Sequence, residues 1–108
     1  MFESKYDQDA NTLIFNFSGH MDSACCMPMA PTIENKVTEH AGDSAQINKP
    51  LKVVFDLKEV DFISSAFIRI CMVTAGALKS GNLTLLNACP LIKKTIKISG
   101  LENLLTIL

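Results

Sequence analysis

Apolar and polar residues alternate near the start of the chain. In TLIFNFS, residues 12–18, the side chains of Leu13, Phe15 and Phe17 fall on one face of an extended strand, so that face is wholly apolar. Residues 2–7 also have strand character, and DQDANT between the two segments has turn chemistry. The pattern predicts a hairpin whose loop is longer than two residues.

The next segment loses this alternation. Pro28 and Pro31 interrupt SGHMDSACCMPMAP, and a proline ring is excluded from a regular helix interior because it lacks an N–H donor, although either proline fits a first helical turn. Apolar residues then recur at every fourth position: Met29, Ile33 and Val37. We therefore expect a helix over residues 31–40 and a polar loop over residues 41–50.

The second half of the chain alternates between strand-like and helix-like runs. LKVVFDL, residues 51–57, is an apolar run rich in β-branched residues, which is typical of a strand buried on both faces. Helical periodicity covers residues 65–80, and a further strand pattern covers residues 82–88. PLIKKTIKIS is a second amphipathic helix, bounded by Pro90 and Gly100. A turn and a short final strand are expected at the end of the chain.

The order of these elements is typical of the α/β class. It predicts a mixed, mostly parallel β-sheet with about three to four helices packed on it. A chain of 108 residues is long enough for one modest core and too short for two. Residues 1–108 are therefore expected to form a single domain.

Composition excludes several classes of partner and location. The formal net charge of −1 gives no electrostatic reason to expect a nucleic acid or an anionic membrane as partner. No apolar run approaches the roughly 20 residues that a membrane-spanning helix needs. The acidic start MFESKYDQD lacks the basic-then-apolar pattern of a signal peptide. We expect a cytoplasmic protein without membrane insertion.

Neither catalysis nor a cofactor is indicated. The cysteines form no CxxC pair, so we expect reduced thiols and no metal site: Cys25, Cys26, Cys71 and Cys89. His20 and Asp22 lie near the adjacent Cys25 and Cys26 in sequence, but nothing orients the histidine as the base of a thiol nucleophile. The chain also lacks GxxxxGK[ST] and GxGxxG, so no motif supports nucleotide binding. We expect no enzyme.

Two adjacent serines stand where the apolar strand gives way to a helix, in DFISSAFIR. Ser64 or Ser65 is placed to cap that helix, an interaction worth about 1 kcal/mol. The same position suits phosphorylation, because a phosphate adds about −1.5 to −2 charges beside the positive end of the helix dipole. The residues alone leave both interpretations open.

The helix after the serines is apolar around most of its circumference. One stripe suits packing on a sheet: Ile68, Cys71, Met72, Ala75 and Leu78. Other apolar residues, among them Phe67, Ile70 and Val73, lie on different faces of the helix. Such a helix is either covered by neighbouring helices or presents an apolar surface to a partner, which includes a second copy of the chain.

These segments together resemble a known family. FSGHMD, VVFDLKEVDFISSAFIR, NLTLLNA and ISGL, in this order, resemble a STAS domain, the fold of the bacterial anti-sigma factor antagonists, over nearly the whole chain. Gly19 and Asp22 match the glycine and aspartate that follow the second strand of the family. The segment around the family's switch serine is matched by FISSA, residues 62–66.

The resemblance implies a STAS-like fold that acts by partner switching and catalyses nothing itself. Ser65 corresponds to the phosphoacceptor. In its unphosphorylated form such a domain binds an anti-sigma factor, often itself a serine-protein kinase; phosphorylation releases the partner, and a phosphatase resets the domain. On this view Asp22 and Ser64 are polar neighbours in the partner site, and Phe67 and Ile70 are its apolar contacts.

The chain differs from the family pattern in three ways. Phe67 stands where the family usually has glycine, and Ser64 replaces a common aspartate. Pro28 and Pro31 fall where the first helix of the family usually begins, so that helix is expected to start late or be distorted. The alternative function for such a chain is a subunit that docks constitutively on a transporter ATPase of the lipid-transport type, without phosphorylation.

Overall fold

An open sheet of five strands runs through the part of the chain that the computed structural model describes, residues 2–46, 51–78 and 82–108. Within these residues the elements follow one another in this order: β1 (Phe2–Asp7), β2 (Thr12–Met21), α1 (Ser23–Gln46), β3 (Lys52–Ile63), α2 (Ser65–Ala77), β4 (Leu83–Leu86), α3 (Pro90–Ser99), the 3-10 helix η1 (Leu101–Asn103) and β5 (Thr106–Ile107).

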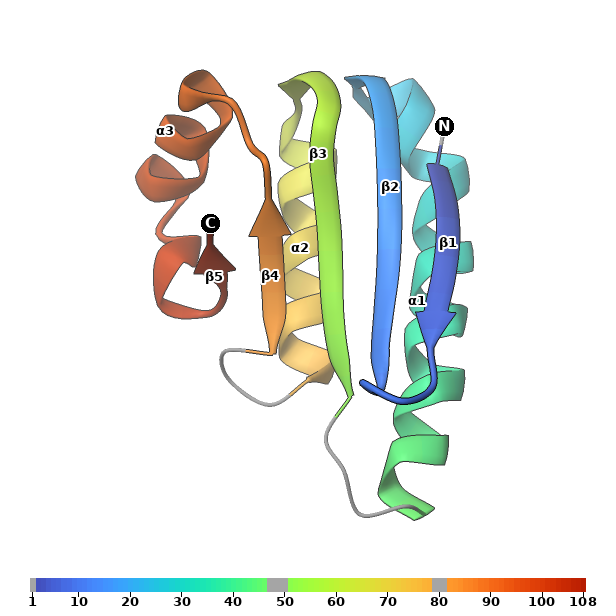
Figure 1. The fold of residues 1–108 in the computed structure, drawn as a ribbon. Helices are drawn as coiled ribbons and strands as arrows, with labels where there is room; N and C mark the ends of the chain where they lie inside the picture. Colours follow the sequence, from blue (N-terminus) through green and yellow to red (C-terminus); the bar gives the residue numbers. More distant parts are fainter. Residues whose placement is uncertain (1, 47–50, 79–81) are drawn as a thin grey trace.

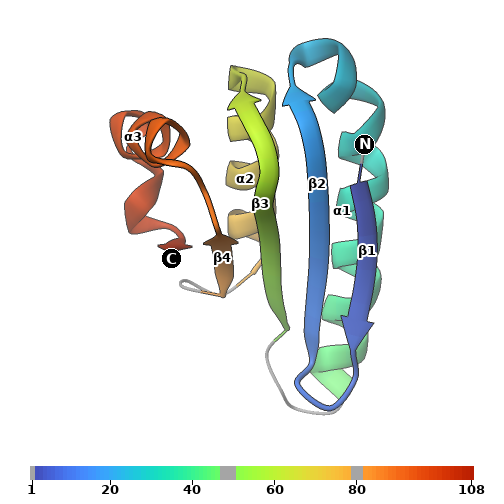
Figure 2. The same ribbon diagram turned by 45° about the horizontal axis from the view of Figure 1, so that its top comes forward.

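The strands lie side by side in the order β1-β2-β3-β4-β5. β1 and β2 are antiparallel, and every later pair is parallel. Helices α1 and α2 lie next to each other on the same side of the sheet, while α3 lies beside the β4–β5 edge (Figures 1 and 2). The predicted α/β class and mixed, mostly parallel sheet are confirmed.

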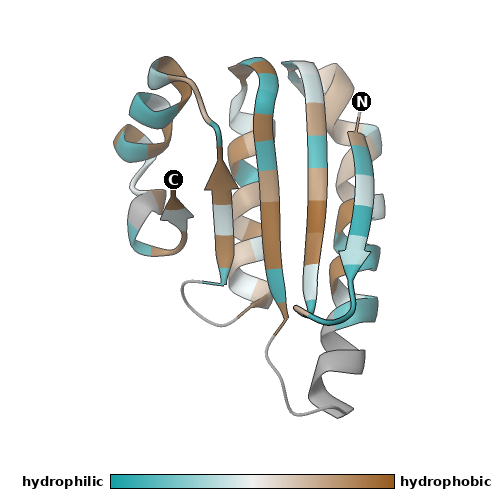
Figure 3. Ribbon diagram, in the orientation of Figure 1, coloured by the Kyte–Doolittle hydropathy of each residue, from teal (hydrophilic) through white to brown (hydrophobic). Residues whose placement is uncertain are grey.

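Alternation in the two central strands builds the core. On β2 the side chains of Leu13, Phe15 and Phe17 are buried, and Asn16 between them is exposed. Figure 3 shows the resulting bands of apolar and polar residues along β2 and β3. The Phe55 ring of β3 meets the rings of Phe15 and Phe17 edge-on, at centroid distances of 5.6 and 5.1 Å. Such edge-to-face contacts add to the free energy gained by burying the rings.

Helix α1 is much longer than the sequence predicts. It begins at Ser23, contains both Pro28 and Pro31, and continues to Gln46. The expected late start is wrong, and so is the loop expected over residues 41–46; residues 47–50 lie outside the described residues. The physical reason is burial, because the free energy gained by packing four α1 side chains into the core exceeds the cost of the backbone hydrogen bonds that the prolines remove. These side chains are Cys26, Met29, Ile33 and Val37.

Strand β3 is also longer than predicted, because it pairs with β2 as far as Ile63. Two register shifts in this pairing, after Asn16 and after Gly19, let the strands stay together to the β3–α2 junction. The hairpin, α2, β4 and α3 appear within a few residues of their predicted positions, although residues 79–81 lie outside the described residues. Helix α3 ends as predicted at Gly100, whose φ of 81° is the left-handed conformation that favours glycine.

The buried face of α2 is rotated from the predicted stripe. The structure buries Phe67, Ile70 and Cys71 with Thr74 and Ala75. Met72, expected to face the sheet, is 50% exposed. Since α2 is apolar on nearly every side, its periodicity did not specify which side would face the sheet.

Candidate functional site

Ser64 and Ser65 form the junction between β3 and α2. Ser64 has an extended backbone, with φ −100° and ψ 174°, and its N–H donates to the carbonyl of Met21 at 2.9 Å. The Ser64 carbonyl accepts the first helical hydrogen bond, from the N–H of Ile68. This ties the junction to the end of β2, and it places Ser65, whose side chain is exposed, at the first position of α2.

The Ser64 side chain does not cap the helix. It makes no capping hydrogen bond, so the capping role considered for it is wrong. Its Oγ atom is buried without a hydrogen bond of standard geometry to the described residues, and it lies beside the Cys26 thiol. The two serines therefore differ: Ser64 points inward toward α1, and Ser65 is open to solvent.

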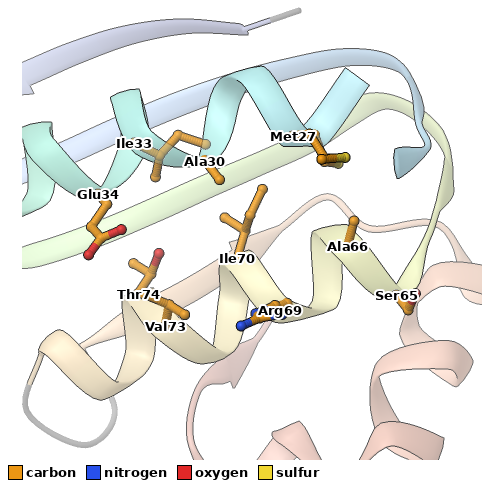
Figure 4. A pocket seen from close by; sticks show the side chains of 11 residues that line it. Met27, Ala30, Ile33, Glu34, Ser65, Ala66, Arg69, Ile70, Val73 and Thr74 are labelled. Atoms are coloured by element: carbon orange, nitrogen blue, oxygen red, sulfur yellow. The ribbon is translucent and has the colours of Figure 1, made fainter. Parts of the chain in front are cut away.

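A groove runs between α1 and α2, and Ser65 lies at one end of it (Figure 4). Its volume is about 720 Å³. Its walls include Met27, Ala30 and Glu34 from α1 and Ser65, Arg69 and Val73 from α2.

The groove combines exposed apolar surface with two opposite charges. Met27 is 72% exposed and Val73 is 46% exposed, although both are apolar. Glu34 and Arg69 come from opposite walls, and the ion pair found among the described residues, between His20 and Asp61, includes neither of them. Exposed apolar side chains rimmed by charges are typical of a surface that binds another macromolecule.

Comparison with known proteins identifies the fold family. The sequence model of the STAS domain family matches residues 4–108. The chain belongs to the STAS domain family. A search of curated protein sequences finds no match.

Solved structures share the fold of this STAS domain at low sequence identity. The anti-sigma factor antagonist SpoIIAA in its unphosphorylated form is 13% identical with a TM-score of 0.65, and the alignment covers 100% of this chain and 87% of that one. The Bacillus cell fate determinant SpoIIAA in the phosphorylated form is 16% identical with a TM-score of 0.67, covering 100% and 91%. An anti-sigma factor antagonist from Mycobacterium paratuberculosis is 21% identical with a TM-score of 0.68, covering 99% and 85%.

The structure separates the residues expected to contact a partner. Ser65 and Ile70 both line the groove, with Ile70 largely buried at its floor. Phe67 is 0% exposed and packs edge-on against Phe17 at 5.2 Å, so the folded STAS domain does not offer its ring as a direct contact. The ring at this position, where the family usually has glycine, fills the core beneath α2.

Asp22 belongs to the start of α1. Its carboxylate accepts a hydrogen bond from the N–H of Cys25 at 2.9 Å, and its carbonyl accepts one from the N–H of Cys26 at 2.9 Å. This is the geometry of an N-cap, which satisfies helix N–H groups that otherwise lack partners. Asp22 thus sets where the α1 wall of the groove begins.

A pair of exposed polar residues lies at the ends of β2 and β3. His20 Nδ1 and Asp61 Oδ1 are 2.8 Å apart, and the His20 ring stacks on Phe62 with a centroid distance of 4.7 Å. His20 is thus paired with a carboxylate rather than with the thiol of Cys25 or Cys26. Across the described residues, no cluster of three or more His, Cys, Asp or Glu side chains could hold a metal ion.

The buried thiols are poor nucleophiles. Burial raises the pKa of Cys26, the neighbouring Cys25 raises it further, and the Ser64 hydroxyl offsets only part of this. Burial, with a smaller contribution from Cys26, also raises the pKa of Cys71. Because the reactive form of cysteine is the thiolate, both side chains act as small packing groups at neutral pH.

Of the described helices, none is long and apolar enough to cross a membrane.

Sequence patterns did not reveal three of the groove residues: Met27, Glu34 and Arg69. Taken singly in the sequence, Glu34 and Arg69 have the pattern of ordinary charged residues exposed to solvent. Only the packing of α1 against α2 brings them to one surface.

Proposed function

We propose that this STAS domain acts by partner switching in the cytoplasm. In its unphosphorylated form it binds an anti-sigma factor or a serine-protein kinase, phosphorylation of Ser65 releases that partner, and a phosphatase restores binding. The observation that carries the proposal is the position of Ser65, which is exposed at the start of α2 and lines a partly apolar groove.

The position of Ser65 suits a modification that changes binding and leaves the fold intact. A phosphate at the first residue of α2 lies at the positive end of the helix dipole, which stabilises a negative charge. A partner in the groove would have to remove water from that dianion, and burying an unpaired charge is costly. Phosphorylation is therefore expected to weaken docking and to preserve the domain.

The groove residues take complementary roles in this proposal. Met27 and Val73 supply the exposed apolar contacts, and Ile70 forms the floor beneath them. Asp22 and Ser64 position the two helix starts on either side. The domain itself catalyses nothing, since the kinase and the phosphatase carry out both chemical steps.

Similar structures support the proposal, because a protein of the same fold exists in a phosphorylated and an unphosphorylated form. SpoIIAA is named as an anti-sigma factor antagonist and has been solved in unphosphorylated and phosphorylated forms. The same fold is thus known to tolerate a phosphate. Extending this behaviour to the present chain rests on the resemblance of residues 62–66, which include Ser65, to the family's switch segment.

The proposal is tested first by intact-mass spectrometry of the protein purified from its native host, with fragmentation across residues 61–69. Part of the population should carry one phosphate on Ser65. Proteins that co-purify with the unphosphorylated form are then titrated against Ser65→Asp, Ser65→Ala and the neighbouring control Ser64→Ala. We expect Ser65→Asp to lose at least about tenfold in affinity, which corresponds to about 1.4 kcal/mol, and both alanine variants to bind.

Undiminished binding by Ser65→Asp and by the phosphorylated protein would contradict the switch. If no phosphate appears under any growth condition and a transporter ATPase co-purifies, the groove is instead a permanent docking surface on that ATPase. The exposed apolar side chains of Met27 and Val73 would serve such an interface equally well.

A further inference from the structure

Arg69 lies one helical turn after Ser65 on α2. Residues four apart are neighbours on a helix surface, and both of these side chains are exposed and line the same groove (Figure 4). Among the described residues that line the groove, Arg69 is the one basic residue. The ion pair that the described residues do form, between His20 and Asp61, does not involve it.

We propose that Arg69 is the internal binding group for a phosphate on Ser65. This inference rests on the proposed function, because it requires Ser65 to be phosphorylated. A guanidinium presents a planar fork of N–H donors that matches two phosphate oxygens, and such charge-assisted pairs are among the stronger hydrogen bonds in proteins. Arginine has a long, flexible side chain, so a change of rotamer brings the guanidinium of Arg69 from the groove wall to its neighbour Ser65.

Among the described residues that line the groove from α1, none is basic, so that wall offers a phosphate no cation in competition with Arg69. Glu34, the charged residue of the α1 wall, lies beside Thr74 at the end of the groove away from Ser65. For a phosphate on Ser65, the cation available within the groove is therefore Arg69, on the same helix.

The pairing indicates what the partner offers. In the unphosphorylated domain Arg69 is available to a carboxylate of the partner, and its neighbours Met27 and Val73 are available to apolar side chains. After phosphorylation the guanidinium is engaged by the phosphate of its own helix. Release then has two causes: the partner faces a dianion, and it loses its cationic contact.

The test uses the full chain with phosphoserine incorporated genetically at position 65, so neither the kinase nor the partner is required. The second pKa of the phosphate, about 6 in an unperturbed phosphoserine, is followed by ³¹P NMR. A nearby cation stabilises the dianion and lowers this pKa. We therefore expect the pKa to be higher by about half a unit or more in Arg69→Gln than in the unmutated chain, and Arg69→Lys to fall between them.

Lys94→Gln on α3 is the matched control, because it removes the same charge from another exposed helical position. It should leave the phosphate pKa unchanged. Equal titration curves for the unmutated chain and Arg69→Gln would overturn the proposal. So would an equal rise in Lys94→Gln, since the effect would then be one of net charge. The proposed function fails separately, if the phosphorylated domain binds its partner as tightly as the unphosphorylated one.

Discussion

Asp22 shows how one side chain sets the start of a functional element. The chain leaves β2 and turns directly into α1, and the Asp22 carboxylate accepts the N–H of Cys25 at that turn. We expect Asp22→Ala to lower the free energy of unfolding by about 1 kcal/mol, because a helix N–H group loses its partner. Asp22→Asn retains an acceptor and should lose less. Urea denaturation of the three proteins measures both effects; equal losses in the two variants would contradict the capping role.

The buried thiols predict a loss of stability in alkali. Burial holds the pKa of Cys26 and Cys71 above the ordinary value of 9.0, so above that pH the unfolded chain releases these protons before the folded chain does. The unfolded state then binds fewer protons, and the free energy of unfolding falls as the pH rises through about 9. Urea denaturation between about pH 8 and pH 10 should show this fall, and it should be shallower in Cys71→Ala. Equal slopes would exclude Cys71 as the source.

Among the elements, α2 carries a separate role on each face. Phe67 and Cys71 enter the core, Ile70 forms the floor of the groove, Val73 belongs to its wall, and Arg69 reaches solvent. The helix therefore couples the packing of the domain to the surface beside Ser65. A substitution on one face should change stability, and a substitution on another should change binding.

The core face of α2 is tested at Phe67. Phe67→Ala should lower the free energy of unfolding by about 3–5 kcal/mol, because it removes a fully buried ring and leaves a cavity. Met72→Ala, on the same helix at a side chain that is 50% exposed, should change it by no more than about 0.5 kcal/mol. Chemical denaturation compares the two. Similar small losses would mean that Phe67 does not occupy the core.

For the molecule as a whole, the groove is the feature that no single element contains. Each helix contributes one wall, and the sheet beneath sets the spacing of the two helices. Binding energy at such a surface is concentrated in a few side chains near its centre. The relative placement of α1 and α2 therefore decides what the groove can bind.

Met27 is the sharpest test of the groove. Met27→Lys places a charge on an apolar wall, so we expect the affinity for the co-purifying partner to fall at least about tenfold. The free energy of unfolding should change by no more than about 0.5 kcal/mol, because Met27 is 72% exposed. Ile98→Lys on α3, at a side chain that is 77% exposed, is the matched control and should bind normally. Unchanged binding by Met27→Lys would place the partner on another surface.

Local patterns predicted the order of the elements and the position of the candidate switch. The alternation of Leu13, Phe15 and Phe17 specified the buried face of β2, because side chains of a strand alternate strictly between its two faces. Gly100 marked the end of α3, because its left-handed conformation is one that other residues seldom adopt. Ser65 was recognised from its place between an apolar strand and a helix, and from the family segment around it.

Packing between distant segments determined the rest. The prolines of α1 predicted a helix boundary, but burial of Ile33 and its neighbours in the core outweighed that local signal. Because α2 is apolar on nearly every side, its periodicity did not indicate the direction in which the sheet would lie. Whether Phe67 faced the core or a partner depended on that direction. The groove arises only once α1 lies against α2, since contacts between helices depend on surfaces that local sequence does not specify.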